Sequence, residues 1–294
     1  MANLKAIRTR IASVKSTRQI TSAMKMVSAA KLRKAQDKIV RLRPYASKLH
    51  EILVGLSQSL AETQIENAYA RQSAPEKVLL IVVTSNRGLC GAFNSNVIKE
   101  TRRVINDLYP SQYKSGNLWL LTIGKKGFDF FRKLKVNLLP EQNNLVANIS
   151  FENIEVVASE IMKKFVSKEF DRIDIVYNQF KNAAIQKLTV EQFLPVKTVS
   201  ESKSKAAPVD YIYEPGKEPV VQDLIPKSLK IQFYKAILDS FVAEHGARMT
   251  AMHKATDNAT EMIRSLTLQY NKARQAAITN QILEVVSGAE ALRG

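Results

Sequence analysis

The sequence has few of the residues that mark several classes of protein. It has one cysteine, Cys90, so a disulfide within the chain is excluded and a reducing compartment is favoured. No apolar run reaches the roughly 18 residues that a membrane-spanning helix needs, so we expect membrane association only through partners. Acidic residues are scarce too: 27 Asp and Glu stand against 44 Lys and Arg, a net charge of +17. This charge predicts an acidic partner, which is nucleic acid, an anionic membrane surface or an acidic protein face.

Motifs that carry chemistry are also missing. The stretch GLCG at residues 88–91 is neither GxGxxG nor GxxxxGK[ST], so we expect a tight turn there and no nucleotide site. His245 and His253 are eight residues apart on a helical pattern, and no cysteine or carboxylate completes a metal set. We therefore predict no catalytic residue, no cofactor and no metal, and we interpret the chain as a non-catalytic protein.

A long helix is predicted over residues 1–60. From Leu32 to Leu60 the apolar positions recur in alternating steps of three and four, which is the seam of a heptad repeat. Pro44 predicts a kink and not a stop, because the seam keeps its register across it. Upstream the same rhythm begins at Leu4, and we expect it to slip by one residue. After that slip, the expected seam residues are Thr17, Ile20, Met24 and Val27.

A second long helix is predicted over residues 227–294. Its seam runs from Ile231 to Ala277 in the same alternating steps, with Pro226 in its first turn and Gly288 as its C-cap. The segment between the two helices alternates apolar, β-branched runs with helical patterns, which predicts a small, mostly parallel α/β sheet. The strands are expected at Val78–Thr84, Leu118–Gly124, Arg172–Asn178 and Ile185–Phe193.

The predicted fold is therefore α/β plus a long antiparallel coiled coil. The N- and C-terminal helices form a shaft, and a central Rossmann-like α/β domain lies at its base. The expected divisions are an N-terminal coiled-coil helix (1–60), a connector (61–77), the α/β domain (78–196), a linker (197–226) and a C-terminal coiled-coil helix (227–294). The first 60 residues hold thirteen Lys and Arg against two acids, a net +11, and the end of the second helix is small and polar. The charge predicts an acidic sleeve around the shaft, and the small, polar end predicts that the tip lies inside another protein.

Four stretches of the chain resemble one protein family. The start, IRTRIASVKSTRQITSAMKMVSAAKLRKAQ, and the end, LTLQYNKARQAAITNQILEVVSGAEAL, are similar to the two ends of the gamma subunit of F-type ATP synthase. TSNRGLCGAFN and DYIYEP resemble two internal signatures of that family. The resemblance implies a central rotor shaft inside a ring of alpha and beta subunits, which turns with a proton-driven c-subunit ring while the beta subunits carry the ATP chemistry.

The resemblance also implies partners and contact residues. It places Met24, Lys25, Arg274, Gln275 and Thr279 against the beta subunits, although many relatives have an acid where Lys25 stands. It implies one copy per complex with alpha, beta and epsilon subunits and the c ring, no nucleic acid, and a location on the cytoplasmic side of a bacterial plasma membrane. Absence of a transit peptide and of a cysteine pair favours a bacterial source without thiol regulation. The residues that the resemblance places at the c ring and epsilon subunit are Tyr211, Tyr213 and Glu214.

Two other interpretations stay open from the residues alone. A basic coiled-coil protein that binds nucleic acid fits the charge, but the basic residues have no aromatic interleaving and no groove-reading motif. A small α/β enzyme with a coiled-coil arm fits the middle segment, and it would need a ligand at the strand ends. From the rotor interpretation we expect Arg274 and Gln275 to contribute to torque coupling, and we expect the isolated chain to be marginally stable.

Overall fold

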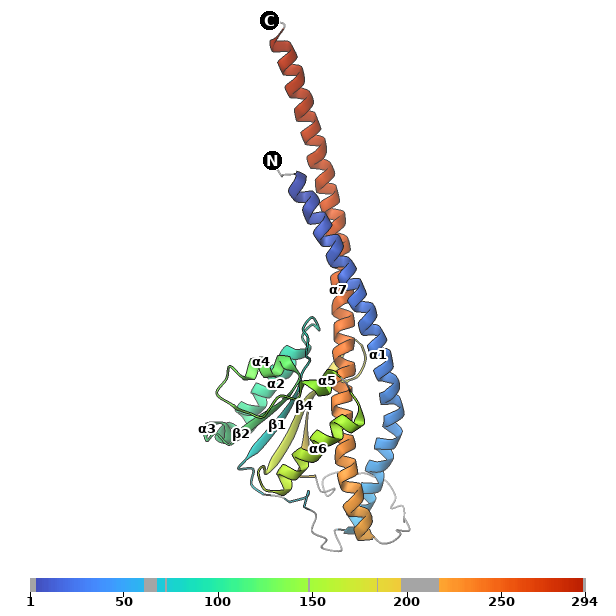
Figure 1. The fold of residues 1–294 in the computed structure, drawn as a ribbon, viewed down its shortest axis with the longest axis vertical. Coiled ribbons are helices and arrows are strands. Elements are labelled where there is room, and N and C mark those ends of the chain that lie inside the picture. The colour runs from blue at the N-terminus through green and yellow to red at the C-terminus, as the bar shows by residue number, and fades with distance from the viewer. Residues whose placement is uncertain are drawn as a thin grey trace. The chain divides into compact units, whose positions relative to one another are not determined.

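The computed structural model describes residues 4–60, 68–71, 73–147, 149–183, 185–196 and 217–292. Two long helices, α1 (Leu4–Leu60) and α7 (Lys217–Ala291), bracket an α/β domain (Figure 1). The chain divides into two compact units, of which the first comprises Met1–Ala29 with Arg248–Gly294 and the second Ala30–Ala247. Both long helices contribute to both units. None of the described helices has the length and apolar content that crossing a bilayer requires.

The second unit holds a mixed five-stranded sheet of order β3-β2-β1-β4-β5. β1 pairs in parallel with β2 and β4, β2 pairs in parallel with β3, and β5 is antiparallel to β4. The prediction of a mostly parallel α/β sheet is confirmed. The elements between the long helices are β1 (Val78–Val83), α2 (Phe93–Leu108), α3 (Pro110–Lys114), β2 (Leu118–Ile123), α4 (Lys125–Phe131), β3 (Asn137–Leu138), α5 (Asn143–Ala147), α6 (Phe151–Val166), β4 (Arg172–Phe180) and β5 (Gln186–Leu194).

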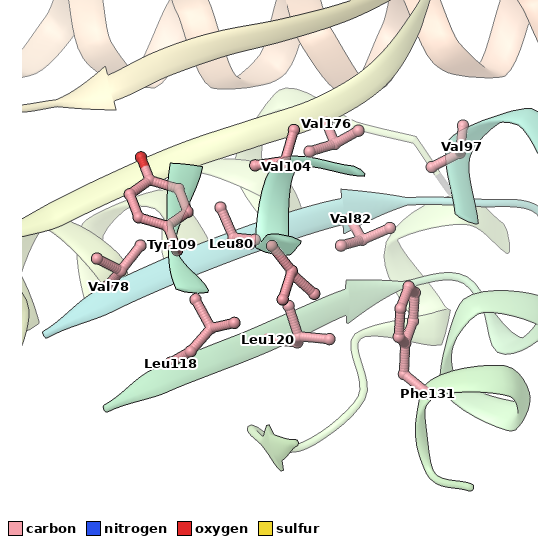
Figure 2. Packing of buried hydrophobic residues seen from close by; sticks show 11 residues of the cluster. Val78, Leu80, Val82, Val97, Val104, Tyr109, Leu118, Leu120, Phe131 and Val176 are labelled. Atoms are coloured by element: carbon pink, nitrogen blue, oxygen red, sulfur yellow. The ribbon is translucent and has the colours of Figure 1, made fainter. Parts of the chain in front are cut away.

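Helices cover both faces of this sheet. All six residues of β1 are buried, as expected for a strand with helices on each side. Alternate residues of β1 and β2 point to the α2 and α4 side, where they form one core with those helices (Figure 2). The other side is covered by α6 and α7 (Figure 1), and Val83 packs there near Ile237 and Phe241 of α7. Each strand that the sequence predicts lies within two residues of its observed bounds.

The C-terminal helix differs from the prediction at both ends. α7 begins at Lys217 and not at 227, so Pro219 occupies the first turn, where a proline fits, and Pro226 lies inside the helix. Gly288 is not a C-cap, because α7 continues past it to Ala291 and its backbone does not adopt the positive φ of a glycine cap. α1 runs through Pro44 without a break, as predicted.

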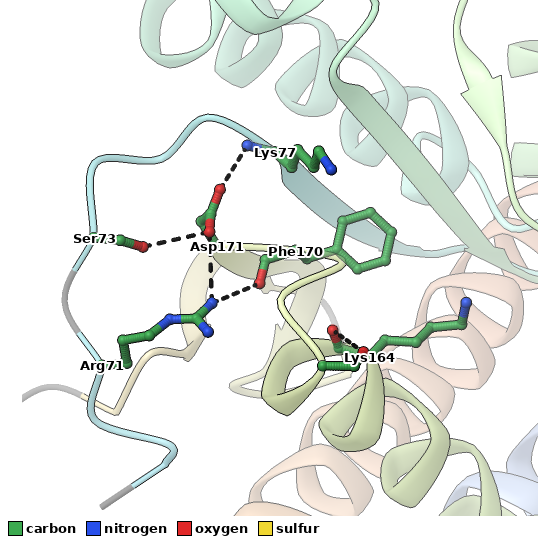
Figure 3. Close-up of polar contacts among 7 residues, drawn as sticks. Arg71, Ser73, Lys77, Lys164, Phe170 and Asp171 are labelled. Atoms are coloured by element: carbon green, nitrogen blue, oxygen red, sulfur yellow. Dashed lines mark hydrogen bonds and ion pairs between the residues drawn. The ribbon is translucent and has the colours of Figure 1, made fainter. Parts of the chain in front are cut away.

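The described part of the connector is tied to the sheet through Asp171 (Figure 3). One carboxylate oxygen accepts a hydrogen bond from the backbone N–H of Lys77 at 3.0 Å. The other oxygen accepts from the Ser73 hydroxyl at 3.4 Å and lies 3.5 Å from the Arg71 guanidinium. Arg71 also stacks over the Phe165 ring at 5.1 Å. A single carboxylate therefore fixes the path of the chain as it enters β1.

Candidate functional site

The two long helices run antiparallel in the first unit. The Thr21 and Thr256 hydroxyl oxygens lie 2.8 Å apart, and Lys25 Nζ lies 3.4 Å from His253 Nδ1. The residue number rises along α1 as it falls along α7, which defines the direction of the pair. The prediction that the N- and C-terminal helices pack together as an antiparallel pair is confirmed.

The predicted slip in the α1 seam is wrong. Ser28 is 2% exposed and Thr21 is buried, whereas Ile20 is 60% exposed and Val27 also faces solvent. The heptad rhythm continues without interruption, but polar residues occupy it between Val14 and Leu32. The seam residues in this stretch are Thr21, Lys25 and Ser28, while Arg18, which has the same heptad spacing, is exposed. A search for apolar spacing alone misses them, and it assigns the exposed apolar neighbours to the seam instead.

Met24 and Lys25 are the predicted beta-subunit contacts on α1. Lys25 occupies a seam position, Met24 lies beside it, and both are half-buried. Lys25 faces His253 of α7 and so has a partner within the chain. The fully exposed apolar side chains beside them are Ile20, Met26 and Val27. These three were not predicted as surface residues. A heptad repeat extended backwards from Leu32 places Lys25 in the seam, and this register puts Ile20, Met26 and Val27 outside the seam.

The other predicted contacts lie on the last part of α7. Arg274, Gln275 and Thr279 are all exposed, and the Thr279 hydroxyl donates to the Gln275 carbonyl at 3.0 Å. The register of the pair brings the described start of α1, Leu4, opposite about residue 273 of α7. Beyond that point no other described helix lies beside α7 (Figure 1). The structure thus brings these three residues onto one uncovered helix end.

This uncovered end is not only small and polar. Ile278, Ile282 and Val285 follow one another in steps of four and three, so they share one face of the helix. Val285 is 72% exposed, and Leu283 and Val286 add further exposed apolar surface. Isolated exposed apolar residues are ordinary, but a continuous apolar ridge on a lone helix marks an interaction surface.

The loop after β1, residues 84–92, uses its polar groups internally. The backbone N–H of Ser85 donates to the Asn94 side chain at 2.9 Å, and the N–H of Lys125 donates to the Asn86 side chain at 3.0 Å. Leu89 and Gly91 have positive φ values of 63° and 59°, which form a turn. A phosphate-binding loop points such N–H groups at its ligand. The arrangement is that of a structural turn, as the sequence predicts.

Tyr211, Tyr213 and Glu214, the residues that the sequence places at the c ring and epsilon subunit, lie outside the described residues.

Comparisons with known proteins agree along the whole chain. A family model described as ATP synthase matches residues 3–292. The ATP synthase gamma chain of Flavobacterium johnsoniae is 57% identical, and that of Cytophaga hutchinsonii is 50% identical, over 100% and 99% of both chains respectively.

Solved structures show the same fold. The rotor of the Euglena gracilis mitochondrial ATP synthase matches with a TM-score of 0.66 and 23% identity, over 94% of this chain and 98% of that chain. The central stalk and c-ring structure of the Tetrahymena thermophila mitochondrial ATP synthase matches with a TM-score of 0.58 and 25% identity, over 80% of this chain and 99% of that chain. The chain therefore belongs to the ATP synthase gamma chain family, the non-catalytic rotor subunit of F-type ATP synthase.

Proposed function

We propose that this chain couples rotation of a proton-driven c-subunit ring to ATP synthesis at the beta subunits by carrying torque along its helix pair. The observation that carries the proposal is the uncovered end of α7, residues 274–292, which stays helical while exposing an apolar ridge. Isolated helices are marginal in water, so a lone helix of this kind needs protein around it. A ring of alpha and beta subunits supplies that surrounding protein.

The charge of α1 supports an acidic partner at the same surface. The first 36 residues contain nine Lys and Arg and no acid, so they cannot form the mixed ion pairs of a solvated helix. Acidic segments of the beta subunits would neutralise this surface. We assign Met24 and Lys25 on α1, together with Arg274, Gln275 and Thr279 on α7, to the beta-subunit contacts.

The remaining partners follow from the family. One copy per complex would bind the epsilon subunit and the c ring, with Tyr211, Tyr213 and Glu214 at that end. The chain would bind no nucleic acid and would reach the cytoplasmic side of the bacterial plasma membrane only through these partners. The support for these assignments is the resemblance of the DYIYEP segment and the bacterial relatives.

A pair of matched variants tests the contact at the α7 end. Ile282→Ser with Val285→Ser removes apolar surface from the ridge, and Val156→Ser removes an equally exposed valine from α6 as the control. Burying one such side chain contributes about 1.5–3 kcal/mol. We expect the double variant to hold alpha and beta subunits at least about tenfold more weakly. Val156→Ser should bind normally, and equal binding of both variants would contradict the contact.

Torque coupling is tested with Arg274→Ala and Gln275→Ala together, measured against Arg264→Ala, another exposed arginine of α7. We expect the double variant to assemble normally but to synthesise ATP more slowly at a fixed proton gradient. An unchanged rate of ATP synthesis would show that these two residues do not contribute to torque coupling. It would not contradict the proposed rotor function itself. Failure of the unaltered chain to recover alpha and beta subunits would remove the whole proposal.

A further inference from the structure

One stretch of α7 has no face open to solvent. Successive residues of a helix are about 100° apart, so a run of buried residues longer than one turn means that protein surrounds the helix. Residues 236–246 are all buried except Phe241, which is half-buried. In contrast, every residue of α7 from 278 to its end is exposed. The second unit therefore encloses α7 along about three turns.

The enclosing segments come from the carboxyl ends of the parallel strands. Cys90 and Phe93, from the loop after β1 and the start of α2, pack against Ala243. The segment after β3 contributes Val146 and Ile149, which line a small void with Ser240 of α7. Open α/β sheets bind their ligands at this edge. Here the chain's own helix occupies it.

The turn between β4 and β5 approaches α7 closely at Gly246. A Cβ atom added at Gly246 would lie 3.3 Å from both the Cα and the carbonyl oxygen of Ala183. Both atoms are backbone, so they cannot rotate away as a side chain would. Glycine is unfavourable in a helix interior, and its presence here has a packing reason: it lets the turn close on the helix. The second unit ends at Ala247, one residue beyond this contact.

We propose that the β4–β5 turn clamps α7 at Gly246, and that this clamp is the point where torque passes between the α/β domain and the C-terminal helix. The inference rests on the rotor function proposed above. Gly246 acts as a positioning residue, since it touches no nucleotide and sets only the fit of the turn. A side chain at this position pushes the turn outward and weakens its hold on α7.

The size of the effect follows from the length of helix that can twist. If the surrounding subunits hold α7 at Gln275, about 28 residues lie between that hold and the clamp. At most, the substitution loosens the whole enclosed stretch, residues 236–246, and extends the free length to about 40 residues. The torsional compliance of a rod grows with its length. The angular variance of the domain about the held end should therefore rise by a factor of about 1.4.

The experiment measures this variance in the assembled complex. The alpha and beta subunits are fixed to a surface without nucleotide, and a bead is attached to the α/β domain through Lys133→Cys, which is exposed while Cys90 is buried. Gly246→Val and the milder Gly246→Ala are compared with Gly88→Val, because a Cβ added at Gly88 meets only the Cε atom of Lys126, at 3.9 Å. We expect a variance up to about 1.4-fold above wild type for Gly246→Val, a smaller rise for Gly246→Ala and no rise for Gly88→Val.

An engineered disulfide distinguishes loss of the clamp from a general loss of structure in Gly246→Val. Ala243→Cys places a second thiol in the cluster that contains Cys90. Oxidation should join the loop to α7 through a disulfide between positions 90 and 243. In a chain with Gly246 the disulfide should leave the angular variance unchanged. In a chain that also carries Gly246→Val it should return the angular variance to the wild-type value until the disulfide is reduced. Equal variance in Gly246→Val and Gly88→Val would overturn the clamp. If wild-type chain did not assemble with alpha and beta subunits, the proposed function and not the clamp would fail. Should Gly246→Val not assemble, Gly246→Ala decides the comparison.

Discussion

Removal of the Asp171 carboxylate should destabilise the α/β domain by a predictable amount. Asp171→Ala removes the acceptor for the Lys77 N–H, the Ser73 hydroxyl and the Arg71 guanidinium (Figure 3). Hydrogen bonds to a charged group contribute about 1.5–3 kcal/mol. The side chain is 19% exposed, so water replaces part of the loss. We expect a net cost of about 2 kcal/mol, which corresponds to a fall of about 4–8 °C in the melting temperature for a unit of this size.

The control lies a few ångströms away in the same loop. Glu169 pairs with Lys164 at 2.7 Å, but both side chains are well exposed. Exposed pairs contribute about 0–1 kcal/mol, so Glu169→Ala should shift the melting temperature by no more than about 4 °C. Asp171→Asn should fall between the two, because its single oxygen serves either Lys77 or the Ser73 and Arg71 pair. Thermal unfolding of the full chain followed by circular dichroism measures all three, and equal shifts for Asp171→Ala and Glu169→Ala would refute the reasoning.

Three other changes have definite expected outcomes. Burial, and then the Asp174 carboxylate, raise the pKa of Tyr109 above its ordinary value near 10. The stability that this group contributes is therefore present below about pH 10 and is lost as the pH rises further. The free energy of unfolding, measured from pH 9 upward, should fall less steeply in Tyr109→Phe than in the wild type. Thr21→Val combined with Thr256→Val removes both partners of one hydrogen bond, and it should leave the unfolding free energy unchanged or raise it slightly in denaturant titrations. Gly288→Ala meets no neighbour and should raise the helicity of the isolated chain, seen as slower amide exchange around residue 288, since alanine is favoured over glycine in a helix by about 1 kcal/mol.

The main elements of the fold were predictable because their signals are strong. Long seams predict long helices, and a fully apolar run such as VLLIVV predicts a strand with helices on both sides. The short elements α3, β3 and α5 were not predicted. They contain five, two and five residues, which is too few for a period to repeat. Their place is set by tertiary packing, as when the backbone N–H groups after β3 bond to β2.

The contact surface was only partly predictable, and the reason is the register of the helix pair. Whether Arg274 is covered or open depends on where α1 begins relative to α7. That relation depends on which residues form the seam. Because Thr21 and Ser28 replace apolar residues there, apolar spacing assigns Ile20 and Val27 to the wrong side of α1. Because the seam residues are polar, apolar spacing does not reveal the register of the helix pair. For the same reason it does not identify the exposed apolar residues that flank Met24 and Lys25.

The position of α7 gives a physical reason why this α/β domain carries no catalytic function at the edge where such domains usually bind ligands. A ligand at the carboxyl ends of the strands needs free backbone N–H groups and an open crevice. In this chain the backbone N–H of Ser85, in the loop after β1, donates to the Asn94 side chain, and the Asn86 side chain of the same loop accepts from the N–H of Lys125. Ala243 packs beside Cys90. The same contacts that exclude a ligand enclose a helix. In other α/β domains this edge of the sheet binds a substrate. In this chain it binds α7, and a rotating subunit requires such a fixed connection between the domain and the helix.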